Sequence, residues 1–265
     1  MTLKIGSVPY LNAKPLVDYF HSADCTEDVE VVYAVPSRLA KMLRNGEVDV
    51  ANCSIFECLS APGLSIVPGV SISSHGPVMS VRLFSNVPIS EIRSVALDTS
   101  SLTSSALTRI VLNERCKAEP TYVNCDPDLD KMLAIADAGL IIGDLKLFDL
   151  QKGTTEYDLG EEWQNSVGLP FVYAAWQTPE ISASHEMTFL LNKAMHWGTQ
   201  RHEELALKWA EKMRLPYERC LKYFREAMVY GLDTSQVYGL NRYRQECIAL
   251  GLIADSPLPA FGPAE

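Results

Sequence analysis

Uncharged polar side chains occur in this sequence where a predicted strand ends and a helix begins, a place from which they could orient a ligand. The first is Asn12, which follows the apolar strand Leu3–Val8 after a break at Pro9. Pro15 then lies in the first turn of a predicted helix, where its missing N–H is harmless. Open α/β sheets bind ligands at the carboxyl ends of their strands. Asn12 could therefore hold a ligand by hydrogen bonds, although an amide is not a strong base.

A second candidate site is the hydroxyl-rich segment 99–105, between the predicted strand Ser94–Leu97 and a helix. Hydroxyls and free backbone N–H groups at a helix N-terminus bind anions, and the helix dipole favours negative charge there. Simple capping of the helix is the alternative, but a cap needs one or two hydroxyls and this segment has six. The segment therefore predicts an anion site, with Thr103 and Ser104 closest to the helix start.

Two further strand ends carry polar groups. Asn52 and Ser54 lie at the end of the short buried strand Val48–Asn52, where they could contact a ligand or merely form the turn. Asp144 ends the very apolar strand Ala138–Ile142. Its carboxylate could accept a hydrogen bond from a ligand hydroxyl or cap the next segment, and the sequence does not separate these roles.

A serine at the start of another predicted strand is the last candidate. Gly76 and Pro77 form a turn signal before the strand Met79–Ser85. By the alternation of the strand, Ser80 faces either a cleft or the core, and a structural role is the simpler reading. His75 could act as a base, but a histidine in a loop is usually solvated.

Composition limits the function classes. The chain has 265 residues, 47% hydrophobic and 21% charged, as in ordinary globular proteins, and a formal charge of −10. Nucleic acids and anionic membranes select a basic face, so neither is an expected partner, whereas a small anionic ligand remains compatible. Seven scattered cysteines without a Cys-x-x-Cys pair indicate reduced thiols. With no signal-peptide pattern or membrane-spanning run, we expect a cytoplasmic protein, or a mature form without its signal.

Several cofactor sites are not indicated. The histidines and cysteines lack the spacing of metal ligands. The sequence contains no Walker loop, no G-x-G-x-x-G segment and no G-x-S-x-G elbow. We therefore expect neither a metal nor a nucleotide cofactor.

The order of predicted elements indicates an α/β protein with two lobes. Strands and helices alternate in the first third, and a second series begins near residue 94. We expect one lobe of residues 1–85 plus 177–265 and another of residues 86–176. The strands Met79–Ser85 and Phe171–Trp176 would cross between them, with a ligand cleft in the middle. From Ser184 the chain is expected to be helical to its end, with a frayed tail marked by Pro257, Pro259 and Pro263.

Several stretches, taken in their order, resemble the chorismate dehydratase family of the futalosine route to menaquinone. They span nearly the whole chain and comprise 8–16, 46–51 with Ser54, 76–81, Thr103-Ser104, 142–144 and 168–176. The resemblance implies a type II periplasmic-binding-protein-like fold and the loss of water from chorismate to give 3-[(1-carboxyvinyl)oxy]benzoate, without a cofactor. A sister enzyme, dihydroxynaphthoate synthase, has a histidine where this chain has Gly143, which favours the dehydratase.

The same resemblance implies roles for the candidate residues. Asn12 and Ser80 would be the catalytic pair, holding the departing hydroxyl and the enolpyruvyl carboxylate of the substrate, which itself could act as the base. Thr103 and Ser104 would bind the ring carboxylate, and Asp144 would orient a hydroxyl. Ser54 and Gly76 complete the expected substrate-binding set.

Two other functions fit a two-lobed α/β protein. One is a non-catalytic binding protein for a carboxylic or aromatic solute, which would need a secretion signal. The other is the ligand-sensing domain of a regulator, but the helical C-terminal region lacks the basic stripe of a DNA-binding segment. Whether the protein is a monomer or a homodimer is left open by the sequence.

Overall fold

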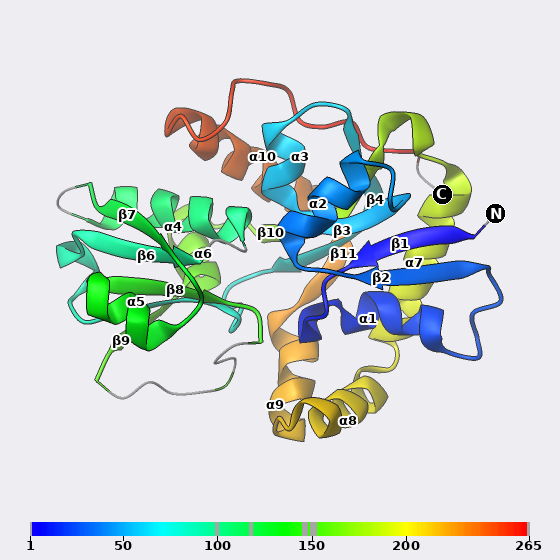
Figure 1. Ribbon diagram of the computed structural model, residues 1–265, viewed down its shortest axis with the longest axis horizontal. Helices are drawn as coiled ribbons and strands as arrows, with labels where there is room; N and C mark the ends of the chain where they lie inside the picture. The colour runs from blue at the N-terminus through cyan, green and yellow to red at the C-terminus, as the bar shows by residue number, and fades with distance from the viewer. Residues whose placement is uncertain (1, 99–100, 117–118, 145–147, 149–152, 264–265) are drawn as a thin grey trace.

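The computed structural model describes residues 2–98, 101–116, 119–144, 148 and 153–263 (Figure 1). The chain forms two α/β halves that lie side by side, each built on its own mixed sheet. Both ends of the chain lie in the half built on the first sheet. No helix among the described residues is both long and apolar enough to cross a membrane.

The first sheet has the strand order β11-β4-β10-β3-β1-β2. β1 runs parallel to β2 and β3, whereas β10 is antiparallel to both β3 and β4. β3 is buried along most of its length, as expected for a strand covered on both faces. The strands are β1 (Leu3–Ser7), β2 (Val29–Tyr33), β3 (Val50–Ser54), β4 (Leu64–Ser74), β10 (Phe171–Pro179) and β11 (Val229–Leu232).

The second sheet has the order β7-β6-β8-β5-β9. β6 is parallel to β7 and β8, and β5 is antiparallel to β8 and β9. Side chains alternate between its faces: Phe84 and Ala96 pack towards α5, while Leu83 and Val95 join the main core. The strands are β5 (Val81–Ser85), β6 (Ser94–Asp98), β7 (Thr121–Cys125), β8 (Ala138–Ile142) and β9 (Thr155–Asp158).

Helices cover both sheets. Around the first sheet are α1 (Lys14–Val17), α2 (Pro36–Arg44), α3 (Ile55–Ser60), α7 (His185–Thr199), α8 (His202–Met213), α9 (Tyr217–Lys222) and α10 (Thr234–Ala249), and around the second are α4 (Leu102–Arg115), α5 (Leu129–Ile135) and α6 (Leu159–Val167). Short 3-10 turns occupy η1 (Leu11–Ala13), η2 (Asp18–His21), η3 (Ile89–Glu91) and η4 (Glu180–Ser182), and η5 (Tyr223–Ala227) is a π-helical turn. α10 contacts both β10 and α4, so it touches both halves.

The chain passes from the first sheet to the second between β4 and β5, and it returns between β9 and β10. The expectation that Met79–Ser85 and Phe171–Trp176 cross as strands was wrong, because β5 lies wholly in the second sheet and β10 wholly in the first. Met79 has φ +65°, which a strand does not adopt. Alternation in the sequence shows that a segment is a strand but not which sheet it joins. The lobe limits at residues 85 and 176 stay a prediction.

The C-terminal region is not helical throughout, contrary to expectation. β11 adds an edge strand to the first sheet, with Val229 opposite Ser73 and Leu232 opposite Gly69. Four residues are too few to show a strand period beside long amphipathic helices. After α10 the chain runs without a helix through the described residues, and Phe261 bridges to Ile66.

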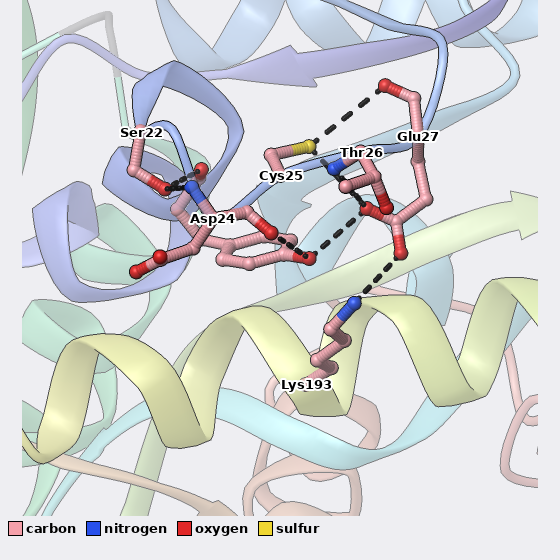
Figure 2. Close-up of polar contacts among 7 residues, drawn as sticks. Ser22, Asp24, Cys25, Thr26, Glu27 and Lys193 are labelled. Carbon is pink, nitrogen blue, oxygen red and sulfur yellow. Dashed lines mark hydrogen bonds and ion pairs between the residues drawn. The ribbon is translucent and has the colours of Figure 1, made fainter.

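One carboxylate fixes the connection between η2 and β2 to α7. Figure 2 shows the side chain of Glu27 lying between this connection and the helix that carries Lys193. Lys193 Nζ donates to Glu27 Oε1 at 2.8 Å, and the Thr26 N–H and the Tyr19 hydroxyl each donate to Oε2 at 3.0 Å. The hydrogen bond from Lys193, helped by the others, lowers the pKa of Glu27 to about 2.

This contact predicts a pH-dependent contribution to stability. Glu27→Gln should lower the free energy of unfolding by roughly 1 kcal/mol at pH 7, because one ion pair is lost at a partly exposed site. The contribution is complete above the unfolded pKa near 4.5 and is lost as pH falls towards about 2. Urea unfolding of both proteins at pH 7 and pH 3 measures it.

Glu203→Gln is the control, since Glu203 pairs with Arg225 at 2.6 Å but is much more exposed. Its effect should stay within roughly 0.5 kcal/mol. Equal losses at both positions, or a Glu27→Gln effect that does not shrink in acid, would contradict the interpretation.

Candidate functional site

A pocket lies between the ends of strands from the two sheets. Its lining comprises Val8, Tyr10, Asn12, Pro36, Asn52, Ser54, Ile72, Val78, Ser80, Val81, Ser101, Thr103, Ser104, Ile142, Gly143, Tyr173 and Ala174. Five of the seven site residues expected from the sequence are among them, drawn from both halves and from the first crossing segment. None of these described lining residues carries a charge.

Asn12 reaches the pocket from η1, directly after β1, as the sequence predicted. The 3-10 turn ends in α1, where Pro15 occupies the first turn. The carbonyl oxygen of the Asn12 side chain is buried and finds no hydrogen-bond partner among the described residues. Burying an unpaired acceptor is costly, so this atom is ready to receive a donor from a ligand.

Asn52 lies on β3 and is 1% exposed. Neither polar atom of its side chain has a hydrogen-bond partner in the described structure. Its amide can both donate to and accept from a ligand. Of the two roles left open by the sequence, ligand contact and turn formation, the structure therefore favours ligand contact. The neighbouring backbone is held by Gln177, whose Nε2 donates to the carbonyls of Cys53 and Ser54 at 3.2 and 2.9 Å.

Hydroxyls at the start of α4 face the first half. The hydroxyls of Ser54 and Thr103 share a hydrogen bond of 2.5 Å across the cleft, and the Phe56 N–H donates to Thr103 Oγ1 at 3.2 Å. Ser101 caps α4 by accepting from the Ser104 N–H at 3.3 Å, and its hydroxyl donates to Ser104 Oγ at 2.9 Å. Capping and pocket lining therefore occur together. Thr99 and Ser100 lie outside the described residues, and anion binding here stays a prediction.

Ser80 is hydrogen-bonded to Tyr223, a residue that the sequence analysis did not identify as a candidate. The Tyr223 hydroxyl donates to Ser80 Oγ at 2.8 Å, and Ser80 Oγ can donate to the Val78 carbonyl at 3.4 Å. Burial raises the pKa of Tyr223 well above its usual range, while hydrogen bonds with Ser80 and Asn12 act in the opposite direction. Tyr223 thus connects the two residues expected to be catalytic.

Tyr223 begins the π-helical turn η5, a feature often found at functional sites. It is 143 positions from Ser80 in the chain. In the sequence it is one of several aromatic residues in a helical region, and such residues are usually core. No local signal marked it as a partner of the pocket residue Ser80.

Asp144 and Gly76 do not line the pocket. Both carboxylate oxygens of Asp144 accept from the Leu11 N–H at 3.0 Å, so Asp144 ties the end of β8 to η1 across the cleft. Burial raises the pKa of Asp144 to about 6, with the Leu11 N–H and the charge of Lys14 acting in the opposite direction. Gly76 has φ +102° in the first crossing, and its carbonyl accepts from Ser74 Oγ at 3.0 Å.

The described lining of the pocket includes no histidine, cysteine or charged side chain. His75 is exposed on the first crossing. In the part of the chain that the structure describes, no group of three or more histidine, cysteine or acidic side chains could hold a metal ion. All seven cysteines are free thiols. The pocket can therefore bind a ligand through hydroxyls, amides and a helix N-terminus, and its own lining offers no ordinary base.

The architecture defines the class of protein. A protein of Archaeoglobus fulgidus superposes with a TM-score of 0.76 at 19% identity, covering 95% of this chain and 98% of that one. The periplasmic aliphatic sulphonate binding protein SsuA of Escherichia coli superposes with a TM-score of 0.67 at 15% identity, covering 96% and 94%. The protein has a periplasmic-binding-protein-like fold, which confirms the expected fold class.

The sequence comparison identifies the family. The model of the menaquinone biosynthesis family matches residues 3–249, and the chain belongs to that family. A chorismate dehydratase of Thermus thermophilus is 28% identical over 267 residues, covering 94% of this chain and 95% of its own. A chorismate dehydratase of Campylobacter jejuni is 25% identical over 252 residues, covering 93% and 98%. These matches confirm the family resemblance that the ordered sequence motifs indicated.

The raised pKa of Asp144 predicts an inverse pH effect on stability. Because the folded pKa of about 6 exceeds the unfolded value near 3.8, the folded state binds more protons between these pH values. Stability from this group should fall as pH rises from about 4 to about 6. The free energy of unfolding of Asp144→Asn, taken relative to that of wild type, should therefore increase by roughly 2–3 kcal/mol between pH 4 and pH 7. Denaturant unfolding at both pH values measures the difference, and a constant offset would contradict it.

Two buried tyrosines give a matched test of the support behind Ser80. Tyr223→Phe removes a donor to Ser80 Oγ and should lower the free energy of unfolding by about 1 kcal/mol. The Tyr230 hydroxyl is buried with no hydrogen-bond partner among the described residues, so Tyr230→Phe should be neutral or stabilising. Thermal unfolding compares the two, and equal losses would show that the Tyr223 hydroxyl gives no specific support.

Proposed function

We propose that this protein is a chorismate dehydratase, a hydro-lyase that converts chorismate to 3-[(1-carboxyvinyl)oxy]benzoate and water. Its curated relatives with that name match nearly its whole length, and it belongs to a menaquinone biosynthesis family. The observation that carries the proposal is a pocket whose described lining has no charge, and in which Asn12 Oδ1 and both polar atoms of the Asn52 side chain lack a hydrogen-bond partner among the described residues. Such a pocket suits a reaction in which the substrate brings its own charged groups.

The reaction needs little acid–base catalysis by protein side chains. The ring 4-hydroxyl leaves with the hydrogen of the neighbouring ether-bearing carbon, and aromatisation of the ring drives the loss of water. The enolpyruvyl carboxylate of the substrate can take the proton, since no described lining residue is a carboxylate, histidine or lysine. Binding in a reactive orientation supplies much of the catalysis, roughly 7–11 kcal/mol in the best intramolecular cases.

Asn12 and Ser80 are the proposed catalytic residues. The unpaired side-chain carbonyl of Asn12 would accept a hydrogen bond from the ring hydroxyl or a water, and its amide would donate to the enolpyruvyl carboxylate. Ser80 would donate to the departing oxygen. Tyr223 supports both from outside the pocket lining, which keeps their positions before substrate binds.

The ring carboxylate is assigned to the start of α4. The first backbone N–H groups of a helix lack intrahelical acceptors, and the dipole favours an anion there. Thr103 and Ser104 line the pocket at this end, and Ser54 and Asn52 lie opposite. Because the Thr103 hydroxyl already bonds Ser54 and the Ser104 N–H donates to Ser101, the Thr103 N–H and the Asn52 amide would provide the donors to the ligand.

Asp144 and Gly76 remain proposed participants. To orient the substrate hydroxyl, the Asp144 carboxylate would have to share or leave its contact with the Leu11 N–H. Gly76 would contribute through the backbone of the crossing that leads to Ser80.

Turnover of chorismate tests the proposal. Purified protein without added metal or nucleotide should convert the cyclohexadiene ultraviolet spectrum of chorismate into that of a substituted benzoate. Ser80→Ala and Asn12→Ala should each lower kcat by about tenfold or more, because hydrogen bonds made in the transition state are lost. His75→Gln is the control and should leave kcat unchanged, since His75 is exposed and outside the lining.

Binding of chorismate without turnover by folded wild-type protein would contradict the proposal and favour a solute-binding function. That alternative has some support from the sulphonate-binding protein of the same fold, but the family match disfavours it. A loss of activity in His75→Gln would instead indicate a protein base.

A further inference from the structure

One partly buried carboxylate, that of Asp158, accepts hydrogen bonds from both segments by which the chain passes between its sheets. Asp158 ends β9, at the start of the return to the first sheet, and caps α6. Its Oδ1 accepts from the N–H groups of Gly160 and Glu161, at 2.9 and 3.2 Å. The same carboxylate accepts from Val78 at 3.0 Å and, through Oδ2, from Met79 at 2.7 Å. Val78 and Met79 belong to the outgoing crossing, so both passages meet at one side chain.

The outgoing crossing has a conformation that needs such support. Met79 has φ +65°, the left-handed region that residues other than glycine rarely adopt. A strained residue of this kind persists only where its surroundings hold it. The hydrogen bond from the Met79 N–H to Asp158 is the shortest that Asp158 accepts.

The first turn of α6 is packed tightly on the same crossing. A Cβ at Gly160 would lie 2.5 Å from the Gly76 carbonyl oxygen and 2.7 Å from the Tyr173 hydroxyl. Only glycine fits this approach. Tyr173 lines the pocket, and its hydroxyl bonds Ser74 Oγ at 3.1 Å. The contact of the two passages is therefore continuous with the pocket wall.

Ser80 follows immediately after this held segment. Its hydroxyl contacts the Val78 carbonyl at 3.4 Å and the Tyr223 hydroxyl at 2.8 Å, so its position depends on where residues 78 and 79 lie. Val78 itself also lines the pocket.

We propose that Asp158 is a positioning residue that locks the two crossing segments together and thereby sets the place of the Ser80 hydroxyl. Its effect on turnover rests on the proposed function, whereas its effect on the geometry of the crossing does not. The alternative is that Asp158 serves only as a helix cap.

Asp158→Asn separates these two roles. Asparagine caps helices as well as aspartate does, so the side-chain oxygen can keep its bonds with Gly160 and Glu161. The new NH₂ group then replaces Oδ2 and faces the Met79 N–H, where two donors cannot bond. The matched control is Asp128→Asn, at the cap of α5 in the same half, where Asp128 accepts from the Lys131 N–H at 3.3 Å.

With chorismate as substrate, Asp158→Asn should lower kcat by roughly 10- to 100-fold, as expected for a misplaced reacting group, with KM changed less than about threefold. Asp128→Asn should leave both unchanged. Asp158→Asn should also lower the thermal midpoint. Adding Met79→Gly should recover part of that loss, because glycine adopts positive φ freely, but should not restore kcat, because the N–H of residue 79 still faces the new NH₂ group.

Recovery of kcat together with the thermal midpoint in the double variant would overturn the proposal, as would an Asp158→Asn enzyme with wild-type kcat. Absence of turnover in wild type would refute the proposed function instead. In that case a crystal structure of Asp158→Asn tests the positioning role of Asp158 independently of turnover. We expect the contact between Ser80 and Tyr223 to be broken, and an unchanged contact and Met79 conformation would overturn the inference.

Discussion

The pocket depends on hydrogen bonds that join the two sheets across the cleft. Thr103 at the start of α4 bonds the Ser54 hydroxyl and the Phe56 N–H, and Asp144 after β8 bonds the Leu11 N–H. Each contact joins a strand end or helix start of one sheet to its counterpart on the other. The side chains expected to act on a ligand come from both halves, so they form one site only while these contacts hold.

The absence of charged side chains from the described pocket lining determines how the pocket can bind a ligand. The protein carries a formal charge of −10, yet the described lining is uncharged. An anionic ligand would therefore be held by oriented dipoles rather than by cations. The amide atoms of Asn12 and Asn52 that have no partner among the described residues would each cost roughly 1–3 kcal/mol if a ligand buried them unpaired. A ligand that pairs with them avoids that cost, which favours binding in one orientation.

Much of this site could be predicted because its groups lie at local sequence signals. The turn after the first strand indicated Asn12, and the run of hydroxyls before a helix indicated Thr103 and Ser104; all three line the pocket. Tyr223 and Asp158 could not be found in this way. Tyr223 looks like a core aromatic in a helical segment, and an aspartate before a helix looks like a cap. Their partners, Ser80 and Met79, are distant in the chain, so only the folded backbone brings them together.

The sequence by itself determined the alternation of strands and helices, the strand-end position of the polar residues and the family, because these depend on local periodicity and on motifs within short segments. Tertiary structure decided which sheet β5 and β10 join, that β11 completes the first sheet, and that Asp144 contacts Leu11 rather than lining the pocket. The physical reason is that strand pairing and contacts across the cleft are set by backbone hydrogen bonds and burial between distant segments, for which an alternating apolar pattern leaves several solutions.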